Sequence, residues 1–217
     1  METSGTAKPR VSDRSAFVDR MTKTPQHPSI SKRAMAMQSS PIRKLAAAAE
    51  ARKKSGVKVY HLNIGQPDLP TSPVVFETIR ELRLSTIAYA PSNGLPAALA
   101  AWKNYYHHVG IELDEKEIII TTGGSEAIVF AMCAVCDAGD EVIVFEPFYT
   151  NYNGFATIAD VALRAVPSSI ENGFHLPPVQ EIEKHITSRT RAVLICNPSN
   201  PTGTLYSRNE LSILADL

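Results

Sequence analysis

Short apolar runs alternate with helix-like segments along most of the chain. Three of these runs predict strands, because each is brief, apolar and bounded by turn residues; they are Glu141–Phe145, Val161–Val166 and Arg191–Cys196. Val57–Leu62, where apolar and polar residues alternate, and Glu117–Thr122 predict two more. Strands that alternate with helices indicate an α/β domain with a mostly parallel sheet.

The segments between the predicted strands carry the periodicity and the end signals of helices. The first is expected at 41–54, with proline in its first turn, Ser40 as its cap and Gly56 at its end. Ser207 and Glu210 form a capping-box pattern at the start of the last one. The others are expected at 73–84, 96–109, 125–136, 150–159 and 178–186. The helix at 125–136 is apolar all round from Ala127 onward, so we expect it to be buried.

The composition indicates an ordinary globular protein and suggests no macromolecular partner. Of the 217 residues, 44% are apolar and 20% are charged, and the 22 basic residues balance the 22 acidic ones. Such values are typical of an ordinary soluble globular domain. Zero net charge supplies no basic surface for nucleic acid, and no apolar run reaches the roughly 18 residues of a membrane helix. We therefore expect neither nucleic acid nor a membrane as a partner.

The three cysteines favour a reducing compartment, because an odd number in a chain of this size does not make a disulfide scaffold. Cys133 and Cys136 form a C-x-x-C pattern at the end of the apolar helix. A redox pair needs its attacking thiol near the start of a helix, where the dipole lowers the thiol pKa. No second pair completes a zinc site. We expect neither a metal nor a redox role.

Composition also sets the first thirty residues apart. Residues 1–30 are polar and lack a sustained apolar period, so we expect a disordered or loosely attached tail. Because this tail has neither an apolar signal core nor the composition of a transit peptide, a cytoplasmic location is the expectation.

The stretch Asn197–Gly203, Asn-Pro-Ser-Asn-Pro-Thr-Gly, joins a predicted strand to a predicted helix with two prolines and a glycine in seven residues. Each proline fixes its own φ and keeps the residue before it out of the helical region. Asn197 and Asn200 should therefore be held extended, with their amides directed. A lone Asn-Pro is more often a plain turn. In an open α/β sheet, however, ligands bind at the carboxyl ends of strands, where this loop would lie.

A second candidate site lies at Thr121–Glu126, where Gly123 and Gly124 separate a predicted strand from the apolar helix. Glycines let backbone N–H groups approach an anion, and a helix start adds free N–H groups and the positive end of the dipole. Ser125 adds a hydroxyl donor. The stretch matches neither a Walker loop nor G-x-G-x-x-G, so a nucleotide is not favoured. Seen alone, a Gly-Gly is more often a turn.

Three aromatic residues, Phe148, Tyr149 and Tyr152, follow the next predicted strand. Aromatic residues at a strand end usually pack in the core, but one could offer a flat face beside the phosphate site. A phosphate cradle, an aromatic platform and a directed amide at the ends of neighbouring strands fit a phosphorylated aromatic ring with a polar substituent.

From about Ser31 to Leu217 the sequence resembles the class I/II aminotransferases of the aspartate aminotransferase fold, which use pyridoxal 5′-phosphate (PLP). Asn197–Gly203 resembles the family's highly specific N-P-x-N-P-T-G signature. Three shorter matches are N-x-G-x-P-D-x-P at Asn63–Pro70, Y-x-x-x-x-G at Tyr89–Gly94 and G-G-[ST]-x-A at Gly123–Ala127. The resemblance implies an incomplete three-layer α/β sandwich with a mostly parallel sheet. Residues 31–70 would form an N-terminal arm and small-domain segment, and residues 71–217 the PLP-binding large domain, truncated before the Schiff-base lysine. It also implies a homodimer, when full length, that acts on an amino acid and a 2-oxo acid.

The resemblance further implies which residues hold the cofactor. Gly124, Ser125 and Glu126 form the phosphate turn, in which the backbone N–H groups of the last two and the serine hydroxyl bind the phosphate. Tyr149 stacks on the pyridine ring, and Asn200 donates to the phenolic oxygen of that ring.

Two residues nearer the N-terminus have roles by the same resemblance. Gly65 offers its backbone to the substrate carboxylate. Tyr89 reaches the phosphate of the neighbouring subunit, which is why a homodimer is implied.

The resemblance places the catalytic lysine past the printed sequence. The family needs a lysine that forms a Schiff base with PLP and a carboxylate that keeps the pyridine nitrogen protonated, and both follow the asparagine loop. Lys184, the last lysine here, precedes that loop, and Asp216 comes too early to be the acid. We expect no catalytic residue before Leu217, so that this polypeptide alone binds PLP weakly, if at all, and does not transaminate. The absent strands should leave apolar surface of the helix at 127–136 uncovered.

Other functions stay open on the sequence alone. A PLP-dependent lyase of the same fold shares this cradle, because groups outside it decide the fate of the carbanion. A non-catalytic pseudoenzyme that binds a partner would need a stable short chain. A PLP-sensing regulator with a DNA-binding domain would need a helix-turn-helix before Ser31, where the chain is too short and too polar. No residue fixes the amino-acid donor.

Overall fold

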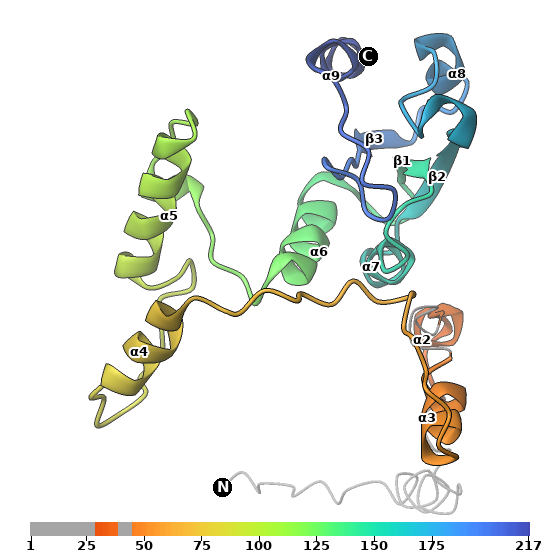
Figure 1. Cartoon of the computed structure of the whole chain (residues 1–217). Helices are drawn as coiled ribbons and strands as arrows, with labels where there is room; N and C mark the ends of the chain where they lie inside the picture. Colours follow the sequence, from red (N-terminus) through yellow and green to blue (C-terminus); the bar gives the residue numbers. More distant parts are fainter. Residues whose placement is uncertain (1–28, 39–44) are drawn as a thin grey trace, which may run out of the picture. The chain divides into compact units, whose positions relative to one another are not determined.

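The computed structural model describes residues 29–38 and 45–217 (Figure 1). The chain divides into two compact units, of which the first ends at Ala36 and the second begins at Met37. The described part of the first unit holds the short helix α2, Lys32–Ala36. The Ser31 hydroxyl caps α2 by accepting the Ala34 N–H at 3.1 Å. Nearly all of the expected tail, the Ser40 cap and the start of the helix at 41 lie outside the described residues.

The second unit carries the other elements. In chain order they are α3 (Ala46–Lys54), α4 (Pro73–Glu81), α5 (Pro96–His108), the 3-10 helix η2 (Glu115–Glu117), α6 (Gly124–Val135), β1 (Glu141–Glu146), α7 (Tyr152–Ala159), β2 (Ala162–Pro167), the 3-10 helix η3 (Ile170–Asn172), α8 (Val179–Glu183), β3 (Thr190–Val193) and α9 (Arg208–Ala215). Each predicted helix within the described residues is therefore present, although several are shorter than expected. In the part of the chain that the structure describes, no helix is both long and apolar enough to cross a membrane.

The three strands form one parallel sheet in the order β2-β1-β3 (Figure 1). Glu141 of β1 pairs with Ala162 of β2 and with Thr190 of β3, so all three strands begin at the same edge. Because the strands are parallel, their carboxyl ends also share one edge. The α/β class with a parallel sheet, which the alternation of elements predicts, is confirmed.

Two predicted strands are wrong. Val57–Leu62 and Glu117–Thr122 form no strand in the structure, because neither finds another strand to pair with among the described residues. The backbone N–H of Ile120 donates instead to the Asn93 carbonyl at 2.9 Å. This contact brings the backbone of Gly94 against the Ile120 side chain, at a φ of +122° that favours glycine. A β-branched run thus stays extended without becoming part of the sheet.

One cluster of the core packs the strands β1 and β2 against the helices α8 and α9. Its buried residues are Ile143, Phe145, Val166 and Ile182, and Leu176, Val193 and Leu214 pack against them. Full burial of one such side chain contributes about 1.5–3 kcal/mol. This cluster fixes β1 at the centre of the unit.

The expectation that α6 is buried is wrong. Met132 is its one buried residue, and Phe130 and Val135 are about half exposed. One side of α6 packs against α7, but the described residues provide no layer for its other apolar positions. The expectation that apolar surface of this helix stays uncovered is confirmed. A helix that is apolar all round needs neighbours on every side, and this chain supplies them on one.

A buried carboxylate holds the amino-terminal edge of the sheet together. Glu141 of β1 accepts hydrogen bonds from Arg189 Nε (3.0 Å), Arg164 Nε of β2 (3.0 Å) and the Thr187 hydroxyl (2.7 Å). The bonds from Arg189, Arg164 and Thr187 lower the pKa of Glu141 to about 2. The strands β1 and β2 and the segment that leads into β3 are therefore joined through one negative charge.

Replacing Glu141 with Gln should lower the free energy of unfolding at pH 7. This deficit, the difference in free energy of unfolding between the unaltered chain and the variant, should be smaller at pH 3. The folded pKa lies below the roughly 4.3 of an unfolded glutamate, so the charge stabilises the fold fully above that value. The stabilisation is lost as pH falls toward 2. Urea unfolding followed by circular dichroism at pH 7, 5 and 3 measures the deficit. Glu146→Gln, exposed at the other end of β1, is the control. An equal deficit of E141Q at all three pH values would contradict this role of the charge.

Candidate functional site

The carboxyl ends of β1 and β3 enclose a narrow crevice of about 10 Å³. Residues that follow β1 line one side of it and residues that follow β3 line the other. The lining residues are Phe145, Pro147, Phe148, Tyr152, Leu194, Ile195, Cys196, Ser199, Asn200 and Tyr206. The structure thus brings together Asn200 and two of the three aromatic residues that the sequence singled out. Cys196 joins them without having been predicted as a site residue, although its place directly before the asparagine loop is a signal for it.

Backbone hydrogen bonds fix the path of the asparagine loop, 197–203. The Ser199 N–H donates to the Thr204 carbonyl and the Gly203 N–H donates to the Ser199 carbonyl, both at 2.8 Å. The Asn197–Pro198 and Asn200–Pro201 peptide bonds are cis. The two hydrogen bonds close the loop into a turn.

The two asparagines of the loop differ in what holds them. The side-chain oxygen of Asn197 accepts the backbone N–H of the buried Tyr206 at 2.9 Å, so this amide is directed toward the protein. The side chain of Asn200 is exposed at the crevice. Asn197 therefore shapes the loop, whereas the amide of Asn200 faces a position that a ligand could reach.

A second set of hydrogen bonds ties the loop to the segment before α8. The Thr204 hydroxyl donates to the Gly173 carbonyl at 2.7 Å. Glu210 accepts the Leu176 N–H at 3.0 Å, lies 3.0 Å from His175 Nδ1, and closes the capping box with Ser207 at the start of α9. Burial alone would raise the pKa of Glu210, but these hydrogen bonds outweigh it and lower the pKa to about 2. The predicted capping box is confirmed, and it also supports the site.

An aromatic cluster follows β1. The ring of Tyr152 is buried, stacks with Phe148 at 6.3 Å between centroids and meets Tyr149 edge to face at 5.4 Å. Burial, with a further contribution from the neighbouring Cys196, raises the pKa of Tyr152 to about 12. Tyr152 is thus a neutral phenol between the two loops, and Tyr149 is the more accessible ring.

The Gly-Gly turn begins α6 as predicted. Gly123 adopts a φ of +78°, a left-handed conformation that glycine accepts readily, and leads into the helix. The first-turn N–H groups of Gly124, Ser125 and Glu126 precede the point where i→i−4 partners exist, so they are available to an anion. Gly124 and Ser125 are exposed. The geometry fits a phosphate group.

One feature of this turn was not foreseen. The Glu126 carboxylate folds back and accepts the Thr122 N–H at 2.6 Å. It therefore takes up one backbone donor beside the free N–H groups and adds a negative charge to the place where a phosphate would lie. In helices, such a bond from the third residue stabilises the N-terminus.

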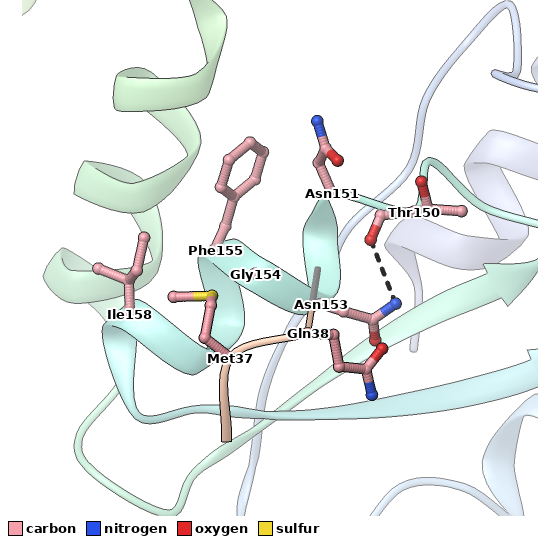
Figure 2. Close-up of a pocket in the computed structure, with 8 residues that line it drawn as sticks. All are labelled: Met37, Gln38, Thr150, Asn151, Asn153, Gly154, Phe155 and Ile158. Atoms are coloured by element: carbon pink, nitrogen blue, oxygen red, sulfur yellow. Dashed lines mark hydrogen bonds between the residues drawn. The ribbon is translucent and has the colours of Figure 1, made fainter. Parts of the chain in front are cut away.

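A second cavity, of about 210 Å³, lies against the first turn of α7 (Figure 2). Its lining residues are Met37, Gln38, Thr150, Asn151, Asn153, Gly154, Phe155 and Ile158. Asn153 Nδ2 donates to the Thr150 carbonyl at 3.2 Å, while Asn151 Nδ2 donates to the Tyr149 hydroxyl at 2.6 Å. Sequence reasoning missed Asn151; an asparagine two residues after a candidate site tyrosine was the available signal.

Gly65 and Tyr89 do not join the residues that line the crevice. Both are exposed, and Tyr89 is completely so. A residue whose role is to reach a second subunit must be exposed in a single chain, so the position of Tyr89 agrees with that role without testing it.

The cysteines and the acidic residues form no further chemical centre. Cys133 is exposed, and burial together with the nearby Asp140 raises the pKa of Cys136, which is the reverse of an activated thiol. Among residues 29–38 and 45–217, no three histidine, cysteine or acidic side chains gather as metal ligands would.

The chemistry of these groups suits PLP part by part, although Tyr149 and the first residues of α6 are not among the residues that line the crevice. The free N–H groups at the start of α6 suit the phosphate, the half-exposed Tyr149 ring suits the pyridine, and the Asn200 amide suits an oxygen on that ring. None of the residues that line the crevice is a lysine.

Comparison with known proteins extends this picture. The family model for aminotransferase class I and II matches residues 57–217. The chain is similar to a probable aspartate/prephenate aminotransferase of Thermus aquaticus, with 35% identity over 79% of this chain and 45% of that protein. It is also similar to the aspartate/prephenate aminotransferase of Thermus thermophilus, with 33% identity over 87% and 49%. The chain spans about half the length of these curated relatives.

Solved structures share the fold. A single mutant of Thermus thermophilus aspartate aminotransferase matches with a TM-score of 0.81 and 32% identity over 88% of this chain and 50% of that one. An alanine aminotransferase from Pyrococcus furiosus matches with a TM-score of 0.78 and 30% identity over 87% and 49%. The range that the family model matches includes the three strands, the asparagine loop and the Gly-Gly turn.

Asn197→Ala and Asn200→Ala should have different effects on stability, because Asn197 shapes the loop and Asn200 faces the candidate site. Removal of the Asn197 amide leaves the buried Tyr206 N–H without its partner, so we expect a loss of about 1 kcal/mol in the free energy of unfolding. Asn200→Ala lies in the same loop at an exposed position and should change it by less than about 0.5 kcal/mol. Urea unfolding of both variants measures the difference. Equal losses would contradict the assignment of Asn197 as the structural residue.

Proposed function

Because this chain belongs to the aminotransferase class I and II family, we propose that it forms the cofactor-holding part of a PLP-dependent aminotransferase. Such an enzyme transfers an amino group between an amino acid and a 2-oxo acid. The observation that carries the proposal is the convergence of Asn200 and the aromatic cluster at the carboxyl ends of two parallel strands. That edge of an α/β sheet is where ligands bind.

In this proposal each part of the site holds one part of the cofactor. The N–H groups of Ser125 and Glu126 and the Ser125 hydroxyl bind the phosphate at the start of α6. The Tyr149 ring lies against the pyridine, and the Asn200 amide donates to its phenolic oxygen. When bound, PLP supplies the electron sink for the reaction. The chain's own residues bind and orient it and exclude water from one face of the ring.

The Glu126 carboxylate limits the affinity for this phosphate. It lies at the start of the same helix, where it satisfies the Thr122 N–H at 2.6 Å. A carboxylate and a phosphate dianion at the start of one helix repel each other, and solvent partly screens this repulsion because Glu126 is only half-buried. Glu126 therefore stabilises the turn when no phosphate is bound and lowers the affinity of the turn for phosphate.

The substrates and the partner are part of the same proposal. Gly65 offers its backbone to the substrate carboxylate, and Tyr89 reaches the phosphate of a second subunit in a homodimer. The relatives named above are aspartate/prephenate, aspartate and alanine aminotransferases, so neither a lyase nor a pseudoenzyme is favoured. Aspartate with 2-oxoglutarate is the first pair to test.

We expect Glu126→Gln to bind pyridoxamine 5′-phosphate two- to fivefold more tightly than the unaltered chain. The amide keeps an acceptor for the Thr122 N–H and removes the like charge. Ser125→Ala, which removes a phosphate donor, should weaken binding three- to tenfold. Calorimetric titration measures both, and this ligand avoids reaction with surface lysines because it has no aldehyde. Unchanged affinity in both variants would contradict the phosphate site.

The 217-residue polypeptide by itself should not transaminate. Among the described residues no lysine lines the crevice, so none of them is in place to move the substrate's α-proton as a Schiff-base lysine would. An assay with PLP, aspartate and 2-oxoglutarate should show no turnover above PLP alone, with Thermus thermophilus aspartate aminotransferase as the positive control. Turnover by the purified chain would show that the catalytic lysine has been misplaced.

A further inference from the structure

The ring of Tyr149 is held from two directions. Its hydroxyl accepts a hydrogen bond from Asn151 Nδ2 at 2.6 Å, slightly shorter than the usual range for such bonds. The edge-to-face contact with Tyr152, at 5.4 Å between centroids, restrains the other end of the ring. A tyrosine at a loop would otherwise rotate about two side-chain bonds, so these contacts select one ring plane.

The side chain of Asn151 is not used to cap the helix that it precedes. Asn151 directly precedes α7, and its backbone is already helical, with φ −70° and ψ −13°. A capping residue is normally extended, so the Asn151 side chain makes no capping bond. Its amide donates to the Tyr149 hydroxyl instead.

A neighbouring asparagine shows what a purely structural role looks like. The Asn153 side chain donates to the Thr150 carbonyl and thereby closes the turn before α7. The side chains of Asn151 and Asn153 leave this turn in different directions (Figure 2). Two asparagines in one turn therefore serve different partners, one the backbone and the other the candidate site tyrosine.

We propose that Asn151 is a positioning residue of the candidate site: by holding the Tyr149 hydroxyl, it fixes the plane of the ring against which the cofactor ring packs. This inference rests on the proposed function, because it assigns a purpose to the orientation of Tyr149. Asn151 itself need not touch the cofactor. Its effect passes through one hydrogen bond, so removal of either partner of that bond should have the same consequence.

A double-mutant cycle on the whole chain tests the inference. Asn151→Ala and Tyr149→Phe should each weaken pyridoxamine 5′-phosphate binding three- to tenfold, and the double variant should lose no more than the greater of the two. Asn151→Asp, which still offers the phenol a hydrogen-bond partner, should restore part of the affinity. Asn153→Ala is the matched control from the same turn and should stay within twofold of the unaltered chain. Losses that multiply in the double variant would overturn the inference.

A measurement on the free chain separates this inference from the proposed function. The side-chain amide resonances of Asn151 should shift when Tyr149 is replaced with Phe, while those of Asn153 should not. If the unaltered chain binds no pyridoxamine 5′-phosphate, the proposed function fails, and the Asn151 resonances then decide whether this residue holds Tyr149. If the side-chain amide resonances of Asn151 do not change when the Tyr149 hydroxyl is removed, the inference is overturned, whether or not the ligand binds.

Discussion

The parallel pairing of β1 with a strand on each side is the constraint on which the rest of the structure depends. Glu141 lies in register with Ala162 and Thr190, so the three strands start together. The loop after β1 and the loop after β3 then lie beside each other at the opposite edge. The crevice between Phe148 and Asn200 is a direct consequence of this register. A shift of one residue would turn every β1 side chain to the other face of the sheet.

The two edges of the sheet have different roles. The amino-terminal edge stabilises the fold, and the carboxyl edge holds the candidate site. At the amino-terminal edge, the Glu141 carboxylate is saturated by Arg164, Arg189 and Thr187 and has no capacity left for a ligand. At the carboxyl edge, the Asn200 amide and the Tyr149 ring are at least partly accessible. Buried polar groups that are fully paired stiffen a fold, whereas accessible ones can exchange water for a ligand.

Much of this arrangement could be predicted because it depends on local sequence. Proline and glycine determine the asparagine loop, Ser207 and Glu210 determine the start of α9, and the brief apolar runs determine β1, β2 and β3. The errors concern contacts with distant or absent neighbours. Glu117–Thr122 has strand composition but no strand beside it, and α6 has core composition but one packed side. Side-chain pairs such as Asn151 with Tyr149 also escaped prediction, because composition does not show which way an asparagine turns.

We propose that the start of α6 and the asparagine loop bind one phosphorylated ring. Titration of the ¹⁵N-labelled chain with pyridoxamine 5′-phosphate, followed through its amide resonances, tests this directly. We expect the backbone amides of Gly124, Ser125 and Glu126 and the side-chain amide of Asn200 to shift together along one saturation curve. Shifts in only one of these two groups, or none in either at millimolar ligand, would contradict the claim that they form a single site.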